Sequence, residues 1–122
     1  MFGTSPAKVA KKIDSLVEEL RIIGDRIAGH EEQFQMAKRL GLARDGEDDH
    51  IRLWRRVQTQ LVTKLPEAKA AVLSGEEDYR QINRVLRMTH QQIKEVAADI
   101  SAADRAAEMG RKMARDRFGS KQ

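Results

Sequence analysis

Histidine and acidic residues provide the only spacing in this sequence that could bind a metal ion. Glu47 and His50 have the Glu-x-x-His spacing that each of two helices supplies in di-iron bundles. A second such pair is missing, because neither His30 nor His90 has a glutamate three residues before it. We therefore expect no metal site and interpret Glu47 as part of the turn before a helix.

A calcium loop is the second metal motif to consider. Asp45, Glu47 and Asp49 occupy alternate positions, as calcium ligands do, but His50 and Arg56 replace the glycine and the glutamate that the loop requires. The sequence also lacks cysteine, a glycine-rich phosphate loop, a Gly-x-Ser-x-Gly elbow and a His-Glu-x-x-His motif. We predict that the protein is not an enzyme and uses no cofactor, metal or small-molecule substrate.

His30 differs from the other histidines because it falls on the apolar face of the first predicted helix. A titratable group there can fix the helix register or respond to pH. We favour a simpler interpretation, a partly exposed histidine near a helix end that makes a hydrogen bond. A polar layer shared with Thr89 is a further alternative.

Basic residues form the other group with a chemical role. Arg80, Arg84 and Arg87 share one helical face, and more basic residues crowd the C-terminal end. The predicted basic patch is Arg80, Arg84, Arg87, Arg111, Lys112, Arg115 and Arg117. Three more arginines surround Trp54, namely Arg52, Arg55 and Arg56. Arginine binds phosphate, so a nucleic-acid backbone is one candidate partner, and a solvated face paired with nearby acids is the alternative.

Three long helices are predicted to position these residues. In two segments the inward-facing residues recur at alternating spacings of three and four, which indicates one face of a helix. The first stripe is Val9, Ile13, Leu16, Leu20, Ile23, Ile27, His30, Phe34 and Ala37. The other is Tyr79, Ile82, Leu86, Thr89, Ile93, Val96, Ile100, Ala103, Ala107, Gly110 and Ala114. No segment alternates with a period of two, so we expect no sheet.

Capping residues set the boundaries of the first helix at about 5–40. Thr4 or Ser5 is the predicted N-cap, with Pro6 just inside, and Gly41 is the predicted stop.

The second and third helices are predicted at about 48–73 and 75–118. Pro66 should kink or break the second helix, with a short helix over 66–73, because proline removes a hydrogen bond and clashes with the preceding turn. The sequence from Ser74 to Glu77 has the form of a capping box for the third helix.

These elements predict an all-α fold in a single domain covering 1–122. The connections are short, so neighbouring helices should be antiparallel and form an elongated three-helix bundle or coiled coil. The third helix is the longest, and its last turns should run past the end of the first. The basic C-terminal end, residues 105–122, lies in that overhang.

The net charge of +4 is distributed unevenly along the chain. Residues 42–50 carry one arginine against four acids, whereas residues 105–122 carry six basic residues against two acids. A local surplus of one sign can steer an oppositely charged partner. The sequence shows no signal peptide, no cysteine and no apolar segment of about 18 residues. These features favour a cytoplasmic protein that does not insert into a membrane.

Small residues make the C-terminal half of the third helix the predicted partner-binding surface. Its residues are Ala103, Ala107, Met109, Gly110, Met113 and Ala114. We expect a non-enzymatic helical protein–protein interaction module, such as an adaptor, chaperone, inhibitor or assembly factor, that binds an acidic protein or a second copy. The alternatives are a nucleic-acid-associated protein that uses its arginine-rich faces, or an alanine-rich helix end that needs no partner.

Overall fold

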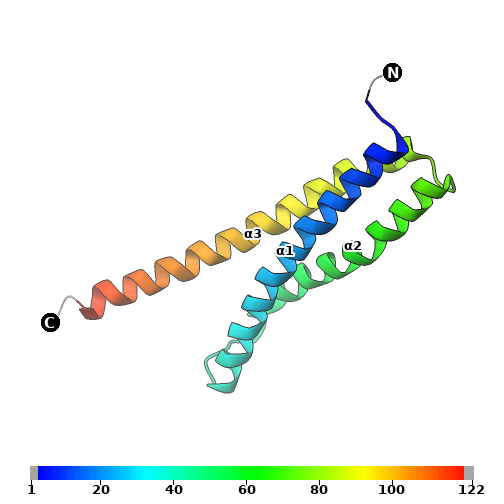
Figure 1. Cartoon of the computed structure of the whole chain (residues 1–122). Coiled ribbons are helices and arrows are strands. Elements are labelled where there is room, and N and C mark those ends of the chain that lie inside the picture. Colours follow the sequence, from blue (N-terminus) through cyan, green and yellow to red (C-terminus); the bar gives the residue numbers. More distant parts are fainter. Residues whose placement is uncertain (1–2, 120–122) are drawn as a thin grey trace.

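Three helices account for most of the chain, of which the computed structural model describes residues 3–119. They are α1 (Pro6–Arg39), α2 (Asp49–Ser74) and α3 (Tyr79–Gly119), and the described residues contain no strand. α1 and α2 form an antiparallel hairpin, and α3 runs back along α1 (Figure 1). The predicted all-α fold with a longest third helix is confirmed.

Local sequence signals begin and end α1 where they were predicted. The Ser5 hydroxyl accepts a hydrogen bond from the Lys8 amide at 3.3 Å. At the other end, Gly41 has a φ of 73°, and the Leu42 amide donates to the Ala37 carbonyl at 2.8 Å. This Schellman arrangement satisfies carbonyls that the helix itself leaves without partners.

Pro66 does not interrupt α2. The helix continues through it to Ser74, so residues 66–73 are not a separate short helix. Leu65 and Val72 are both buried, and their packing on the core offsets the backbone hydrogen bond that the proline removes.

The capping box predicted at Ser74 is not formed. Gly75 adopts a left-handed φ of 83° and ends α2, so Ser74 belongs to the last turn of α2. α3 therefore begins at Tyr79 rather than at Gly75. Asp78 caps it instead, with a carboxylate oxygen that accepts from the Arg80 amide at 2.9 Å.

α1 is central to the core, because α2 and α3 pack mainly on α1 and only slightly on each other. Its stripe is buried continuously from Val9 to Ile27. The buried apolar residues of the other helices are Trp54, Leu65 and Val72 in α2 and Leu86, Ile93, Val96 and Ile100 in α3. Ile100 is fully buried, and no residue of α3 between 101 and 117 is buried.

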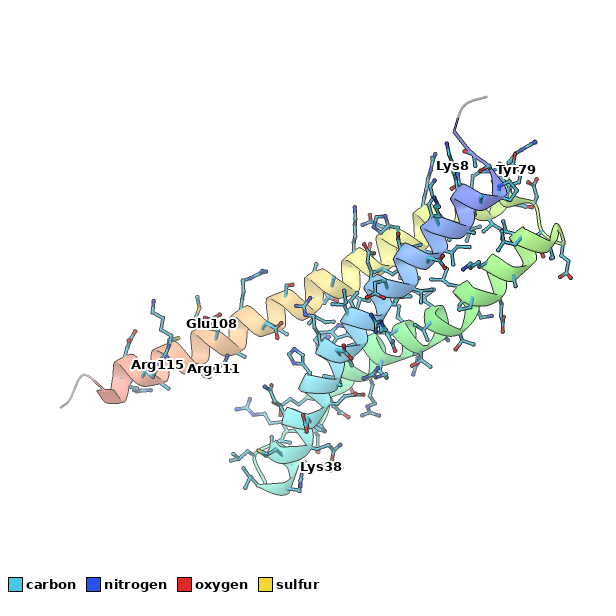
Figure 2. All side chains as sticks on the ribbon, viewed as in Figure 1. Lys8, Lys38, Tyr79, Glu108, Arg111 and Arg115 are labelled. Carbon is cyan, nitrogen blue, oxygen red and sulfur yellow. The ribbon has the colours of Figure 1, made fainter. Side chains whose placement is uncertain are left out.

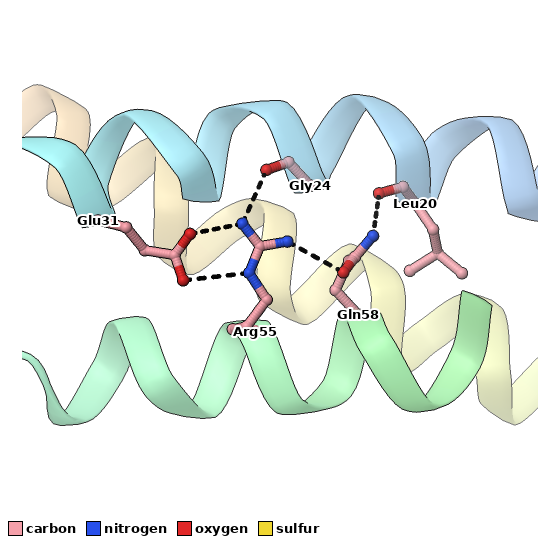
Figure 3. Close-up of polar contacts among 5 residues, drawn as sticks. All are labelled: Leu20, Gly24, Glu31, Arg55 and Gln58. Carbon is pink, nitrogen blue, oxygen red and sulfur yellow. Dashed lines mark hydrogen bonds and ion pairs between the residues drawn. The ribbon is translucent and has the colours of Figure 1, made fainter. Parts of the chain in front are cut away.

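Polar side chains also tie α1 to α2 (Figure 3). Arg55 binds both oxygens of Glu31, at 2.6 and 3.1 Å, and donates to the Gly24 carbonyl at 3.3 Å. Gln58 donates to the Leu20 carbonyl at 3.3 Å. A Cβ on Gly24 would lie 2.8 Å from the Gln58 amide nitrogen, so the glycine permits this close approach.

Beyond Asp104, α3 separates from the hairpin. Figure 1 shows the C-terminal half of α3 projecting on its own while α1 and α2 continue together to their connecting loop. The molecule is therefore a fork with two arms, the free end of α3 and the loop end of the hairpin.

Candidate partner-binding interface

The free arm of α3, residues 105–117, is the α3 extension. Every residue in it is exposed, and Met109 and Met113 each expose 66% of their surface. Five of the six predicted partner-binding residues lie here, namely Ala107, Met109, Gly110, Met113 and Ala114. Ala103 differs, because it is half-buried and packs against the core of the bundle.

The small residues of the α3 extension continue the buried stripe of α3 in register but meet no other helix. Ala107, Gly110 and Ala114 follow Ile100 and Ala103 at spacings of three and four. A Cβ on Gly110 would meet no other atom within 4 Å, leaving aside its neighbouring backbone. This face therefore has room for another helix to approach closely.

The predicted basic patch is divided between the two ends of α3. Arg111, Lys112, Arg115 and Arg117 are exposed on the α3 extension, where Figure 2 shows Arg111 and Arg115 far from the hairpin. These four form no ion pair with another described residue. The rest of the predicted basic end includes Lys121, which lies outside the described residues.

Arg80, Arg84 and Arg87 lie at the other end of α3, beside α1. Residues 79–94 contain four basic residues and no acidic one. The Lys12 ammonium donates to Asn83 at 2.8 Å, and Lys12 and Arg87 line the same groove between α1 and α3. The contribution of Lys12 was not predicted, because only the helix packing brings it beside the arginines.

Two of the arginines around Trp54 are occupied within the chain. Arg52 pairs with Asp48 at 2.9 Å and with Asp49 at 3.5 Å, and Arg55 pairs with Glu31. The hydrogen bond from Arg55 holds the pKa of Glu31 below its ordinary value. Arg52 and Arg55 are therefore not available to phosphate as they stand, whereas Arg56 is exposed.

A cluster of Arg26, His30 and Asp104, the polar clasp, fastens α3 to α1 where the arms of the fork diverge. Asp104 accepts from Arg26 at 3.0 Å, and its other oxygen lies 2.8 Å from His30 Nε2. Arg26 also donates to Ser101 at 3.1 Å. Hydrogen bonds from Arg26, and secondarily from His30, hold the pKa of Asp104 below its ordinary value.

His30 is half-buried and forms a hydrogen bond, as the favoured interpretation predicted, but it lies nine residues before the end of α1 rather than near a helix end. It shares no layer with Thr89, whose hydroxyl donates to the Val85 carbonyl of its own helix. Asp104 and Arg26 were not predicted, because both lie off the apolar stripes and resemble ordinary surface charges. No pattern in the sequence identifies them as a pair.

A cavity of about 670 Å³ lies inside the fork, next to the polar clasp. All three helices line it, with Phe34 from α1, Trp54 from α2 and Ala103 from α3 among the apolar residues. The Trp54 ring is 4% exposed and meets His30 edge to face, with ring centroids 5.4 Å apart. Its indole nitrogen is buried and has no hydrogen-bond partner among the described residues, which is uncommon for a buried donor.

The charged residues lining this cavity are acidic. Glu47 and Asp99 line it together with His30 and His50, and no lysine or arginine does so within the described chain. Glu47 also accepts a hydrogen bond from the Arg44 amide at 2.8 Å, as the predicted turn requires. The described residues contain no group of three histidine, cysteine or acidic side chains placed to hold a metal ion.

Comparisons with protein-family models, with curated protein sequences and with solved structures found no match. Within the described residues, no helix is both long enough and apolar enough to span a membrane. The function therefore has to be inferred from the geometry and charge of the fork itself.

Proposed function

We propose that this protein is a non-enzymatic helical protein–protein interaction module that docks through the α3 extension. The observation that carries the proposal is the face formed by Ala107, Gly110 and Ala114, which continues the core stripe of α3 but is exposed throughout. A single helix of this length is marginal in water without packing, so a partner helix would stabilise it.

The chemistry of the α3 extension selects the kind of partner. Its small residues bury little apolar area by themselves, whereas Met109 and Met113 can adapt to an apolar surface. Its exposed arginines favour an acidic partner and speed the encounter. A cytoplasmic location and a role as adaptor, chaperone, inhibitor or assembly factor accompany this proposal.

Truncation tests whether the α3 extension is separable from the fold. Ending the chain after Arg105 keeps Asp104, which the polar clasp needs. Because residues 106–117 are exposed in the single chain, we expect the melting temperature of the truncated bundle to stay within a few degrees of the parent when both are measured at a protein concentration low enough to keep them monomeric. Circular dichroism should report only the loss of the projecting turns, and collapse of the whole fold would contradict the proposal.

A face-specific crosslink tests docking directly. A photoactivatable side chain at Ala107 should crosslink in cells to a defined protein, which can be this chain itself. The matched control places the same side chain at Met88, an exposed position in the packed half of α3. Equal crosslinking from both positions would count against a docking surface.

A nucleic-acid-associated function is the second candidate, favoured by the basic surface at the other end of α3. Arg84 and Arg87 are exposed there beside Lys12, with no acidic residue in 79–94. Arbitrary duplex DNA or RNA should be retarded at low salt and released as salt rises. Arg84→Glu with Arg87→Glu should abolish retardation, and its absence in the parent protein at low salt would rule this function out.

A further inference from the structure

The α3 extension and the lining of the fork carry opposite charge. The α3 extension has five basic residues against Glu108 and Asp116, and its arginines form no ion pair with described residues. The facing arm ends in the acidic loop at 42–50, and the cavity between the arms is lined by two acids and no lysine or arginine of the described chain. A helix with the composition of the α3 extension therefore fits the fork electrostatically.

Apolar contacts match in the same way. Phe34, Ile51 and Trp54 line the cavity between the arms. The α3 extension offers Met109 and Met113, which are flexible enough to fill an irregular space.

We propose that the partner of the α3 extension is a second copy of this chain, bound so that each extension occupies the fork of the other. This inference rests on the proposed function and names its partner. From one side of the dimer to the other, the order would then be the hairpin of the first copy, the α3 extension of the second copy, the α3 extension of the first copy and the hairpin of the second copy. Such a two-fold arrangement is self-complementary and closes as a dimer without forming a filament.

The small-residue face explains why the two extensions can lie side by side. In an antiparallel pair, Gly110 is at the centre of the α3 extension and faces its own counterpart, with Ala107 and Ala114 on either side. Small residues at these positions let the two backbones approach closely. The outward arginines then reach the acidic lining of the opposite fork, near Glu47 and Asp99.

Cysteine crosslinking tests the arrangement, because the chain has no cysteine of its own. Gly110→Cys should form a disulfide-linked dimer under mild oxidation, since a disulfide needs the two Cα atoms within about 7 Å. Lys112→Cys, exposed on the opposite face, is the control and should stay unlinked. Failure of Gly110→Cys to crosslink, or equal crosslinking at both positions, would overturn the antiparallel arrangement.

A charge swap tests the identity of the partner, with native mass as the readout. The full chain should have twice its monomer mass of 13.9 kDa. One variant combines Arg111→Glu with Arg115→Glu, and the other combines Glu47→Lys with Asp99→Lys. Each alone should dimerise at least about tenfold more weakly, because like charges then face each other. Mixed together, the two should form a heterodimer, because both forks are complementary again.

The matched control is Arg84→Glu with Arg87→Glu, which changes the net charge equally at exposed positions far from the fork and should leave the dimer intact. Melting temperatures check that every variant is folded. A full chain that is monomeric at about 100 μM overturns the inference. If the photoactivatable side chain at Ala107 then crosslinks to a different protein, the proposed function survives without the dimer. If it crosslinks to nothing, the proposed function and the dimer are both overturned.

Discussion

The two halves of α3 have the same helical spacing but differ in side-chain volume. From Tyr79 to Ile100 the stripe carries large residues such as Leu86 and Ile93, and α1 covers them. In the α3 extension the stripe continues as alanine and glycine, and nothing in the described chain covers it. The comparison indicates that spacing specifies the helix, whereas volume decides whether the same chain can bury it.

Removing a large side chain from the packed half of α3 should give the largest loss of folding stability. Ile100→Ala leaves a cavity at a fully buried position, so we expect a loss of about 2–5 kcal/mol in the free energy of unfolding. Met109→Ala, in the α3 extension, should change it by less than about 0.5 kcal/mol at a protein concentration that keeps the chain monomeric. Urea unfolding measures both, and equal losses would show that the two halves form one core.

Stiffening the unpacked half should have a smaller, local effect. Gly110 is helical with open space around its Cβ position, so Gly110→Ala should stabilise the α3 extension by up to about 1 kcal/mol. Hydrogen exchange of amides 105–117 should slow severalfold, while exchange in α1 stays unchanged. Faster exchange in the α3 extension would contradict its helical state.

Removing the charge of Asp104 from the polar clasp should give the smallest loss of folding stability, because the Asp104 side chain is half exposed. Its pKa is lowered in the fold, so its stabilisation is present above the unfolded value of 3.8 and is lost as the pH falls through the lower folded value. Asp104→Asn should cost less than about 1 kcal/mol at pH 7, and the cost should disappear once the pH is below the folded pKa of Asp104. Thermal melts across this range provide the measurement, and a cost that grows on acidification would contradict the assignment.

Much of the fold could be predicted from local chemistry. Ser5 and Gly41 bound α1 as expected, because each acts on backbone groups within one turn. The start of α3 could not be chosen reliably, since Ser74 and Asp78 are both good caps. The left-handed conformation of Gly75 decides between them by ending α2 first.

The candidate site was predictable only in part. The exposed small-residue face followed from side-chain sizes along α3, whereas Ala103, which was grouped with it, is half-buried against the core and lines the cavity. The fork itself depends on the angle at which α3 leaves α1, which no periodic pattern encodes. For the same reason the contact between His30 and Asp104, which lie far apart in the sequence, had no local signal.

Trp54 gives this molecule an intrinsic optical probe. It is the only tryptophan of the chain, and its ring lies at the inner end of the fork against His30. Its fluorescence emission therefore reports on the inner end of the fork without any added label. A blue shift on raising the protein concentration would report displacement of water from the fork, and a bound acceptor for the indole N–H would be visible in the same spectrum.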